Sequence, residues 1–182
     1  MELIKTKAEL LNYLKRIGYN KKEHEYRIAV EALIFTPEGK LLLEKRGPLC
    51  RDEVGKLEGV GGELKADNLL YELGEEFDQE LGAERQGLEI AIERLLEIRQ
   101  VQFEEKDKGL QDWVVVSHLC RLKKGEPVIG EPGKIASLHE ISLEELYEMD
   151  EEKLSNSTIA ARKVYKARYG NRPYYEIPER DN

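Results

Sequence analysis

The sequence predicts an α+β domain built around a mixed or antiparallel sheet. Two β-rich runs joined by a proline-glycine turn form a hairpin between residues 26 and 47, and a further strand-like segment covers 112 to 122. Apolar residues at helical spacing between 70 and 81, and helix-start signals after residue 141, predict helices around these strands. A chain of 182 residues with 40% hydrophobic content is long enough for one domain with its own core.

The first predicted elements are a short helix and the hairpin. Four apolar residues at helical spacing predict an amphipathic helix over residues 4 to 17. The hairpin follows in "YRIAVEALIFTPEGKLLLEKRG", whose turn is Thr36-Pro37-Glu38-Gly39. We expect a single domain over 1–182, with a helical extension (1–25), a core (26–150) and a C-terminal helix and tail (151–182).

The later elements are strands followed by two helices. Residues 87 to 103 alternate like a strand, although the Leu95-Leu96 pair also suits a helix, and we predict strand. The valine run of 112 to 122 indicates a buried or half-buried strand. A loop and short strand then lead to a helix capped by Ser142, with Glu145 at the capping-box position. A last helix is expected to start at Ser157.

Composition excludes several classes of protein. The formal net charge of -8 and pI near 5.2 oppose broad electrostatic binding to nucleic acid or an anionic membrane. The N-terminus has no apolar run long enough for a secretion signal or a membrane span. Cys50 and Cys120 have no metal-ligand spacing and are expected to be reduced thiols. We therefore expect a cytoplasmic protein.

The stretch "GGELKADNLLYELGEEFDQELG", residues 61 to 82, concentrates negative charge after a glycine turn. Glu72, Glu76 and Glu80 follow one another at i, i+4 spacing, beside the apolar stripe of the predicted helix. Like charges at this spacing destabilise a helix by about 0.2–0.5 kcal/mol per pair, and a bound divalent cation would reverse that effect. Mg²⁺ takes hard oxygen ligands and combines carboxylates with substrate phosphates, and the glycines allow a phosphate to approach the backbone.

This arrangement resembles the Nudix hydrolase family, whose box runs G-x5-E-x7-R-E-U-x-E-E-x-G-U, where U is aliphatic. Aligned on Gly61, the chain has Asp67 at the first acidic position and Glu75-Glu76-Phe77-Asp78-Gln79-Glu80-Leu81-Gly82-Ala83 in register. The segments "EALIFTPEGKLLLEKRG" and "EPGKIASLHEISLEEL" are similar to the family's first hairpin and its last strand and helix, so the resemblance covers about 26 to 150. It implies a Nudix-type α/β/α sandwich with a mixed sheet, plus an N-terminal helix and a C-terminal helix and tail.

Four positions depart from the family pattern. Val60 replaces the usual proline, and Asp67 is one methylene shorter than glutamate. Glu75 stands where the family has an arginine, which reverses a charge. Gln79 replaces one of two consecutive glutamates, so one anionic ligand is lost, although a carbonyl oxygen remains.

The resemblance implies a hydrolase that cleaves the diphosphate linkage of a nucleoside diphosphate derivative by metal-assisted attack of water. Mg²⁺ or Mn²⁺ would be the cofactor, held by Glu76, Glu80 and Gln79, with Glu76 and Glu80 as the catalytic residues. Glu76 is the first candidate for the general base, and Glu105 and Glu131 are the alternatives.

The substrate contacts are expected around the glycine turn and the end of the hairpin. Gly61 and Gly62 would approach phosphates with their backbone, and Lys45 and Arg46 would bind them with their charges. Trp113 could stack on a base. Each of these residues also has an explanation without a ligand. The acidic row would be a solvated helix face, Lys45 and Arg46 would be ordinary surface charges, and Trp113 would pack in the core.

A second function stays open beside the hydrolase. A catalytically impaired Nudix-fold module that binds nucleotide or regulates a partner would carry Glu75 and Gln79 as marks of lost turnover. In either case the expected partner is a small nucleotide-type molecule. The N-terminal helix and the tyrosine-rich tail would either build a homodimer interface or cover the core.

Overall fold

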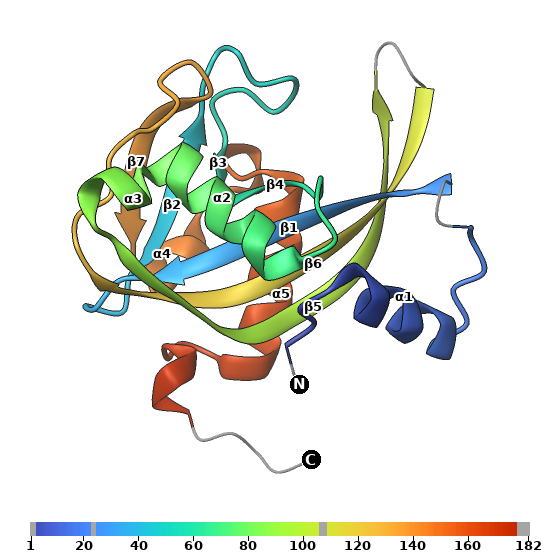
Figure 1. The fold of residues 1–182 in the computed structure, drawn as a ribbon. Coiled ribbons are helices and arrows are strands. Elements are labelled where there is room, and N and C mark those ends of the chain that lie inside the picture. Colours follow the sequence, from blue (N-terminus) through green and yellow to red (C-terminus); the bar gives the residue numbers. More distant parts are fainter. Residues whose placement is uncertain (1–2, 23–24, 106–108, 178–182) are drawn as a thin grey trace.

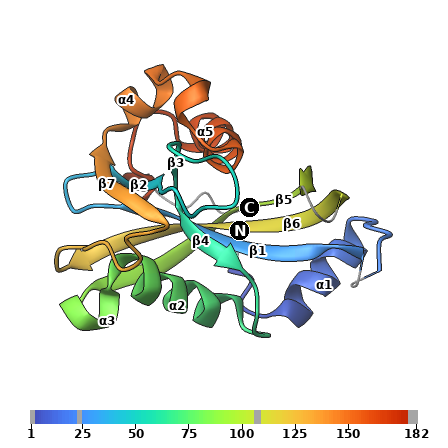
Figure 2. The same cartoon turned by 90° about the horizontal axis from the view of Figure 1, so that it is seen from above.

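The computed structural model describes residues 3–22, 25–105 and 109–177. Figures 1 and 2 show a twisted sheet between two layers of helices. The helices α1 (Lys7–Arg16), α2 (Leu69–Leu81) and α3 (Ala83–Gln86) lie on one face, and α4 (Leu143–Glu148) and α5 (Asn156–Tyr169) lie on the other. The expected α/β/α sandwich with additional N-terminal and C-terminal helices is confirmed.

The sheet is mixed, as expected. Its strands are β1 (Arg27–Phe35), β2 (Leu41–Arg46), β3 (Leu57–Glu58), β4 (Val60–Glu63), β5 (Glu89–Glu105), β6 (Gly109–Lys124) and β7 (Ile135–Ile141). The main path runs β3-β2-β1-β6-β5, while β4 pairs with β1 and β7 pairs with β2. Strands β1 and β6 are parallel from the Arg27–Trp113 pair to the Phe35–Arg121 pair, whereas β1 is antiparallel to β2 and β4.

Alternating residues of β1 feed two separate cores. Val30 and Ile34 pack towards α1 and α2, with the α2 stripe of Leu69, Leu73, Phe77 and Leu81. Leu33 and Phe35 pack towards α4, α5 and the C-terminal segment. A polar side chain of β1 therefore projects towards either the α2 side or the α5 side of the sheet, depending on its position in the strand.

Local capping explains where the helices begin. Asn68 accepts hydrogen bonds from the N–H groups of Leu70 and Tyr71 at the start of α2, and Ser142 and Glu145 form the predicted capping box of α4. The predicted start of the last helix at Ser157 is wrong. Ser155 is the N-cap of α5, because its side chain accepts from the N–H of Thr158.

The C-terminal tail covers the second core. After α5, the 3₁₀ turn η3 (Tyr174–Glu176) inserts Tyr174, which is fully buried beside Phe35 and Tyr165. A shorter 3₁₀ turn, η2 (Glu151–Lys153), precedes α5. No helix among the described residues has the length and apolar character that crossing a bilayer requires.

Candidate functional site

The glycine strand β4 lies directly against α2. The N–H of Gly61 donates a hydrogen bond of 3.1 Å to Oε2 of Glu80. A Cβ on Gly61 would overlap the carbonyl of Val30, and a Cβ on Gly62 would overlap the carboxylate of Glu76. Both glycines are therefore needed for this contact, and they bring backbone and helix carboxylates together.

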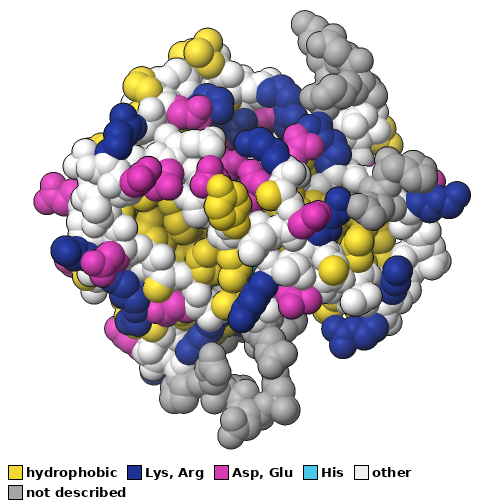
Figure 3. All heavy atoms as spheres, in the orientation of Figure 1, with side chains coloured by type: hydrophobic (Ala, Val, Ile, Leu, Met, Phe, Trp, Pro, Cys, Tyr) yellow, Lys and Arg dark blue, Asp and Glu magenta, His cyan; other side chains and the backbone are white. Residues whose placement is uncertain are grey.

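The acidic row of α2 is enclosed. Glu72, Glu76 and Glu80 have exposed fractions of 4%, 5% and 7%, which excludes a solvated face as the explanation of this row. Glu72 accepts from the N–H groups of Lys65 and Ala66, at 3.0 Å each, and so closes the loop before the helix. Figure 3 shows acidic side chains gathered over α2 on this face.

Two further carboxylates reach this row from strands. Glu44 of β2 and Glu58 of β3 stand directly opposite each other in the sheet. Burial and the negative charge of Glu58 raise the pKa of Glu44 to about 8, and burial, opposed by Arg46, raises that of Glu58 to about 7. Burial and the charges of Glu44, Glu76 and Glu58 raise the pKa of Glu80 well above its ordinary value.

The cations around these carboxylates are already paired or largely exposed. Arg46 pairs through one guanidinium nitrogen with Glu58 and through the other with Asp52, at 2.7 Å. Lys65 approaches Glu76 to 3.7 Å, but its side chain is 64% exposed. Burial raises the pKa of Glu76 against the opposing charge of Lys65. The site therefore favours protonation of its carboxyls or binding of an added cation.

A cavity of about 700 Å³ opens on the other side of the glycine strand. Its walls include Gly61, Gly62, Glu58, Arg46 and Trp113. Trp113 is buried, and the guanidinium of Arg27 lies 4.3 Å from its ring centroid. Glu58 thus belongs to both the carboxylate group and the cavity.

A polar network on the α5 side of the sheet reaches the cavity through Glu31, Arg99 and Ser157. Arg99 donates to Oγ of Ser117 at 2.7 Å, to Glu31 at 3.1 Å and to Ser157. Ser117 and Ser157 also donate to the carboxylate of Glu31, at 2.5 Å and 2.8 Å. Glu97 completes the network with a 2.7 Å ion pair to Arg99. These hydrogen-bonded groups form a polar surface, although the buried Nε of Arg99 has no hydrogen-bond partner among the described residues.

The fold places some of the predicted site residues at the site and leaves others exposed to solvent. Lys45 is exposed and does not line the cavity, whereas Arg46 does. Gln79 is exposed, in contrast to Glu76 and Glu80. Glu75 lies close to Tyr71, one turn earlier in α2, and its carboxylate raises the pKa of the tyrosine hydroxyl.

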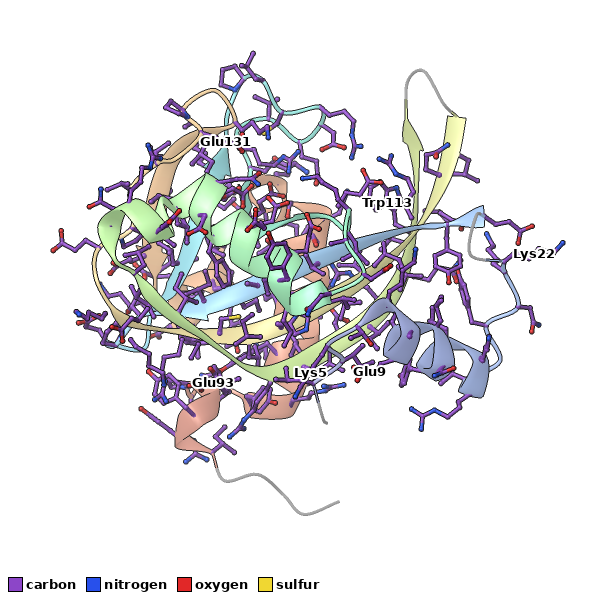
Figure 4. The ribbon with its side chains drawn as sticks, in the orientation of Figure 1. Lys5, Glu9, Lys22, Glu93, Trp113 and Glu131 are labelled. Atoms are coloured by element: carbon purple, nitrogen blue, oxygen red, sulfur yellow. The ribbon has the colours of Figure 1, made fainter. Side chains whose placement is uncertain are left out.

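The two alternative bases lie on different elements. Glu131 precedes β7 and pairs with Lys134 at 2.9 Å, and its charge contributes to the raised pKa of Glu76. Figure 4 shows Glu131 well apart from Trp113 of β6 in the view. Glu105 stands opposite Gly109 in the β5–β6 pairing. Among the described residues, no three Asp, Glu, His or Cys side chains are grouped closely enough to hold a metal ion.

Sequence reasoning missed Glu44, Glu58, Glu31 and Arg99. A signal was present for two of them, because Glu44 and Glu31 are single carboxylates inside the apolar strand runs "LLLEK" and "IAVEALIF". A charge inside a buried strand requires a partner. The sequence does not reveal which partner, since that depends on strand order.

No family model and no curated protein matches this chain. Solved structures do. A MutT Nudix hydrolase of Burkholderia pseudomallei matches with a TM-score of 0.59 at 25% identity, over 76% of this chain and 96% of that one. A MutT protein of Methanosarcina mazei Go1 matches with a TM-score of 0.63 at 18% identity, over 82% and 99%.

A third neighbour is the Nudix domain of NrtR from Shewanella oneidensis, solved with ADP-ribose. Its TM-score is 0.59 at 16% identity, over 90% of this chain and 98% of that chain. The matched structures cover most of this chain and nearly all of their own length, so the likeness extends over the whole fold. The resemblance is confirmed: this chain has the fold of the Nudix hydrolases.

Proposed function

We propose that this protein hydrolyses the diphosphate linkage of a nucleoside diphosphate derivative with the help of Mg²⁺ or Mn²⁺. The observation that carries the proposal is the burial of Glu76 and Glu80 against the glycine strand, next to a cavity of about 700 Å³. That volume falls in the range of roughly 300–1,000 Å³ typical of small-molecule sites. The ADP-ribose bound by the NrtR domain supports a nucleotide-type ligand.

The residues present suit a hard divalent cation. The donors are carboxylates, and a buried oxygen of Glu44 has no hydrogen-bond partner within the described residues. A bound ion would neutralise the phosphate oxygens and make the attacking water more acidic. Glu76 and Glu80 would hold it, whereas the exposed Gln79 would reach it only from the solvent side.

The remaining residues would orient the substrate and accept a proton. The N–H of Gly61 holds the Glu80 carboxylate in place, and the missing Cβ of Gly62 leaves room for Glu76. Arg46 would bind a phosphate by exchanging Asp52 or Glu58 for it. Glu76 stays the first candidate base, and Glu131 is the described alternative near it.

The test is product release from nucleoside triphosphates, ADP-ribose, diadenosine polyphosphates and nucleotide sugars, each with Mg²⁺ or Mn²⁺. Glu76→Gln and Glu80→Gln should each reduce turnover by at least the roughly 10–100-fold known for outer-shell partners of metals. Glu84→Gln, an exposed glutamate of α3, is the matched control and should keep native activity. Binding of nucleotide without turnover of any compound would instead assign the binding or regulatory module. The cytoplasmic location and a homodimer stay predictions.

A further inference from the structure

Of the described site carboxylates, only Glu44 has a buried oxygen without a hydrogen-bond partner. It follows three leucines in β2, its exposed fraction is 3%, and its Oε2 has no hydrogen-bond partner within the described part of the chain. A buried ionised carboxylate is strongly disfavoured unless a cation or a proton neutralises it. The side chain therefore needs a partner at this position.

The pleat of β2 turns Glu44 towards α2. Leu41 and Leu43 pack in the core on the α5 side, whereas Leu42 packs in the core that contains the α2 stripe. Residues two apart in a strand share a face, so Glu44 points to the same side as Leu42. Among the neighbouring charges that raise the pKa of Glu80, that of Glu44 has the largest effect. The unpartnered carboxylate thus faces the helix carboxylates.

Within the described ranges, the neighbouring cations only partly balance the negative charge around Glu44. Five carboxylates interact at this place, and they are Glu44, Glu58, Glu76, Glu80 and Glu131. The neighbouring cations are Arg46, Lys65 and Lys134, of which the two lysine side chains are 64% and 55% exposed. Arg46 already pairs with Glu58 and Asp52. The excess of buried negative charge is a reason to expect a multivalent cation rather than a substrate anion alone.

We propose that Glu44 is a carboxylate ligand of the divalent cation, and that it supplies from β2 the anionic ligand that the acidic helix lacks at Gln79. This inference rests on the proposed function, because it places its ligand at the same metal site. Carboxylates of like charge repel one another, so the cation would draw Glu44, Glu76 and Glu80 together by side-chain rotation. A strand residue in the adjacent sheet would thereby compensate for a change in the helix.

Manganese binding to the full chain tests this proposal without reference to turnover. The free Mn²⁺ signal is followed by electron paramagnetic resonance during titration of the native protein, Glu44→Gln, Glu76→Gln and Glu80→Gln. Glu140→Gln is the control, because Glu140 is an exposed glutamate of β7, the strand beside β2. Glu44→Gln should raise the Kd for Mn²⁺ by about tenfold or more, since ligand charge count sets affinity in such sites, and Glu140→Gln should leave it unchanged.

The outcomes separate the two proposals. Native affinity in Glu44→Gln, together with weakened binding in Glu76→Gln and Glu80→Gln, would overturn the role of Glu44 and leave the metal site in place. Equal affinity in all variants would remove both. A melting curve of each variant checks folding, and Mn²⁺ should raise the Tm of the native chain more than that of Glu44→Gln.

A second variant guards against loss of folding. If Glu44→Gln does not fold, Glu44→Asp keeps the charge but shortens its reach by one methylene. It should also bind Mn²⁺ more weakly than the native chain. Unchanged Mn²⁺ affinity in Glu44→Asp would count against a direct ligand.

Discussion

Substitution of two adjacent glycines, Gly61 and Gly62, by alanine should disturb different properties of the protein. A Cβ at Gly61 would meet the backbone of Val30 and Glu31, which belong to the central strand β1 and cannot move without disturbing the sheet. A Cβ at Gly62 would meet the end of the Glu76 side chain, which can rotate away. Gly61→Ala should therefore affect stability, and Gly62→Ala should affect the site.

The expected magnitudes follow from this difference. Overpacking against fixed backbone costs about 1–3 kcal/mol, so Gly61→Ala should lower the Tm by roughly 2–12 °C at about 2–4 °C per kcal/mol. Rotation of Glu76 costs little, so Gly62→Ala should lower the Tm by less than about 4 °C. Its Mn²⁺ affinity and turnover should nevertheless fall about tenfold or more, because Glu76 leaves its position.

Thermal melting and Mn²⁺ titration of the two variants, side by side, make the comparison. Native affinity and turnover in Gly62→Ala, or native stability in Gly61→Ala, would refute this prediction. The first result would mean that Glu76 does not hold the metal or does not need the space at Gly62, and the second that β4 does not pack on β1 as described.

Three further predictions concern groups outside the proposed metal site. Burial lowers the pKa of His118 to about 4 from 6.5, so the unfolded state binds the proton at a higher pH than the folded state does. The free energy of unfolding should therefore fall by roughly 3 kcal/mol as the pH drops from 7 to 4. Chemical denaturation of His118→Gln should show a shallower decline between these pH values. Tyr174 is fully buried and donates a 2.8 Å hydrogen bond to Glu93. In urea unfolding, Tyr174→Ala should therefore lose about 3–5 kcal/mol of stability and Tyr174→Phe about 1 kcal/mol. Equal small losses in both variants would show that the tail is not part of the core. Arg99→Leu removes the guanidinium and leaves Glu31 buried without its ion pair. The same assay should show a loss of about 3–5 kcal/mol in the free energy of unfolding. A loss below about 1 kcal/mol would argue against the network.

The sequence alone was sufficient to predict most helices and strands and to name candidate residues for the site. Periodicity, caps and turn residues act over a few positions, so the helix α2, the hairpin and the capping box at Ser142 could be predicted. The apolar stripe of α2 was predicted to start at Leu70, but it contains Leu69 instead, together with Leu73, Phe77 and Leu81. The box spacing likewise indicated the fold and the pair Glu76 and Glu80. The start of α5 was missed because two serines, Ser155 and Ser157, compete as caps within three positions.

Only the tertiary structure decided which distant groups meet. Glu44 and Glu58 join the α2 carboxylates because β2 and β3 pair in one particular register. Arg99 reaches Glu31 because the fold places β6 between β5 and β1. Burial depends on these same pairings, and it determines whether a charge is solvated or requires a partner. A local pattern specifies a helix or a strand, but the electrostatics of this site arise from packing between segments far apart in the chain.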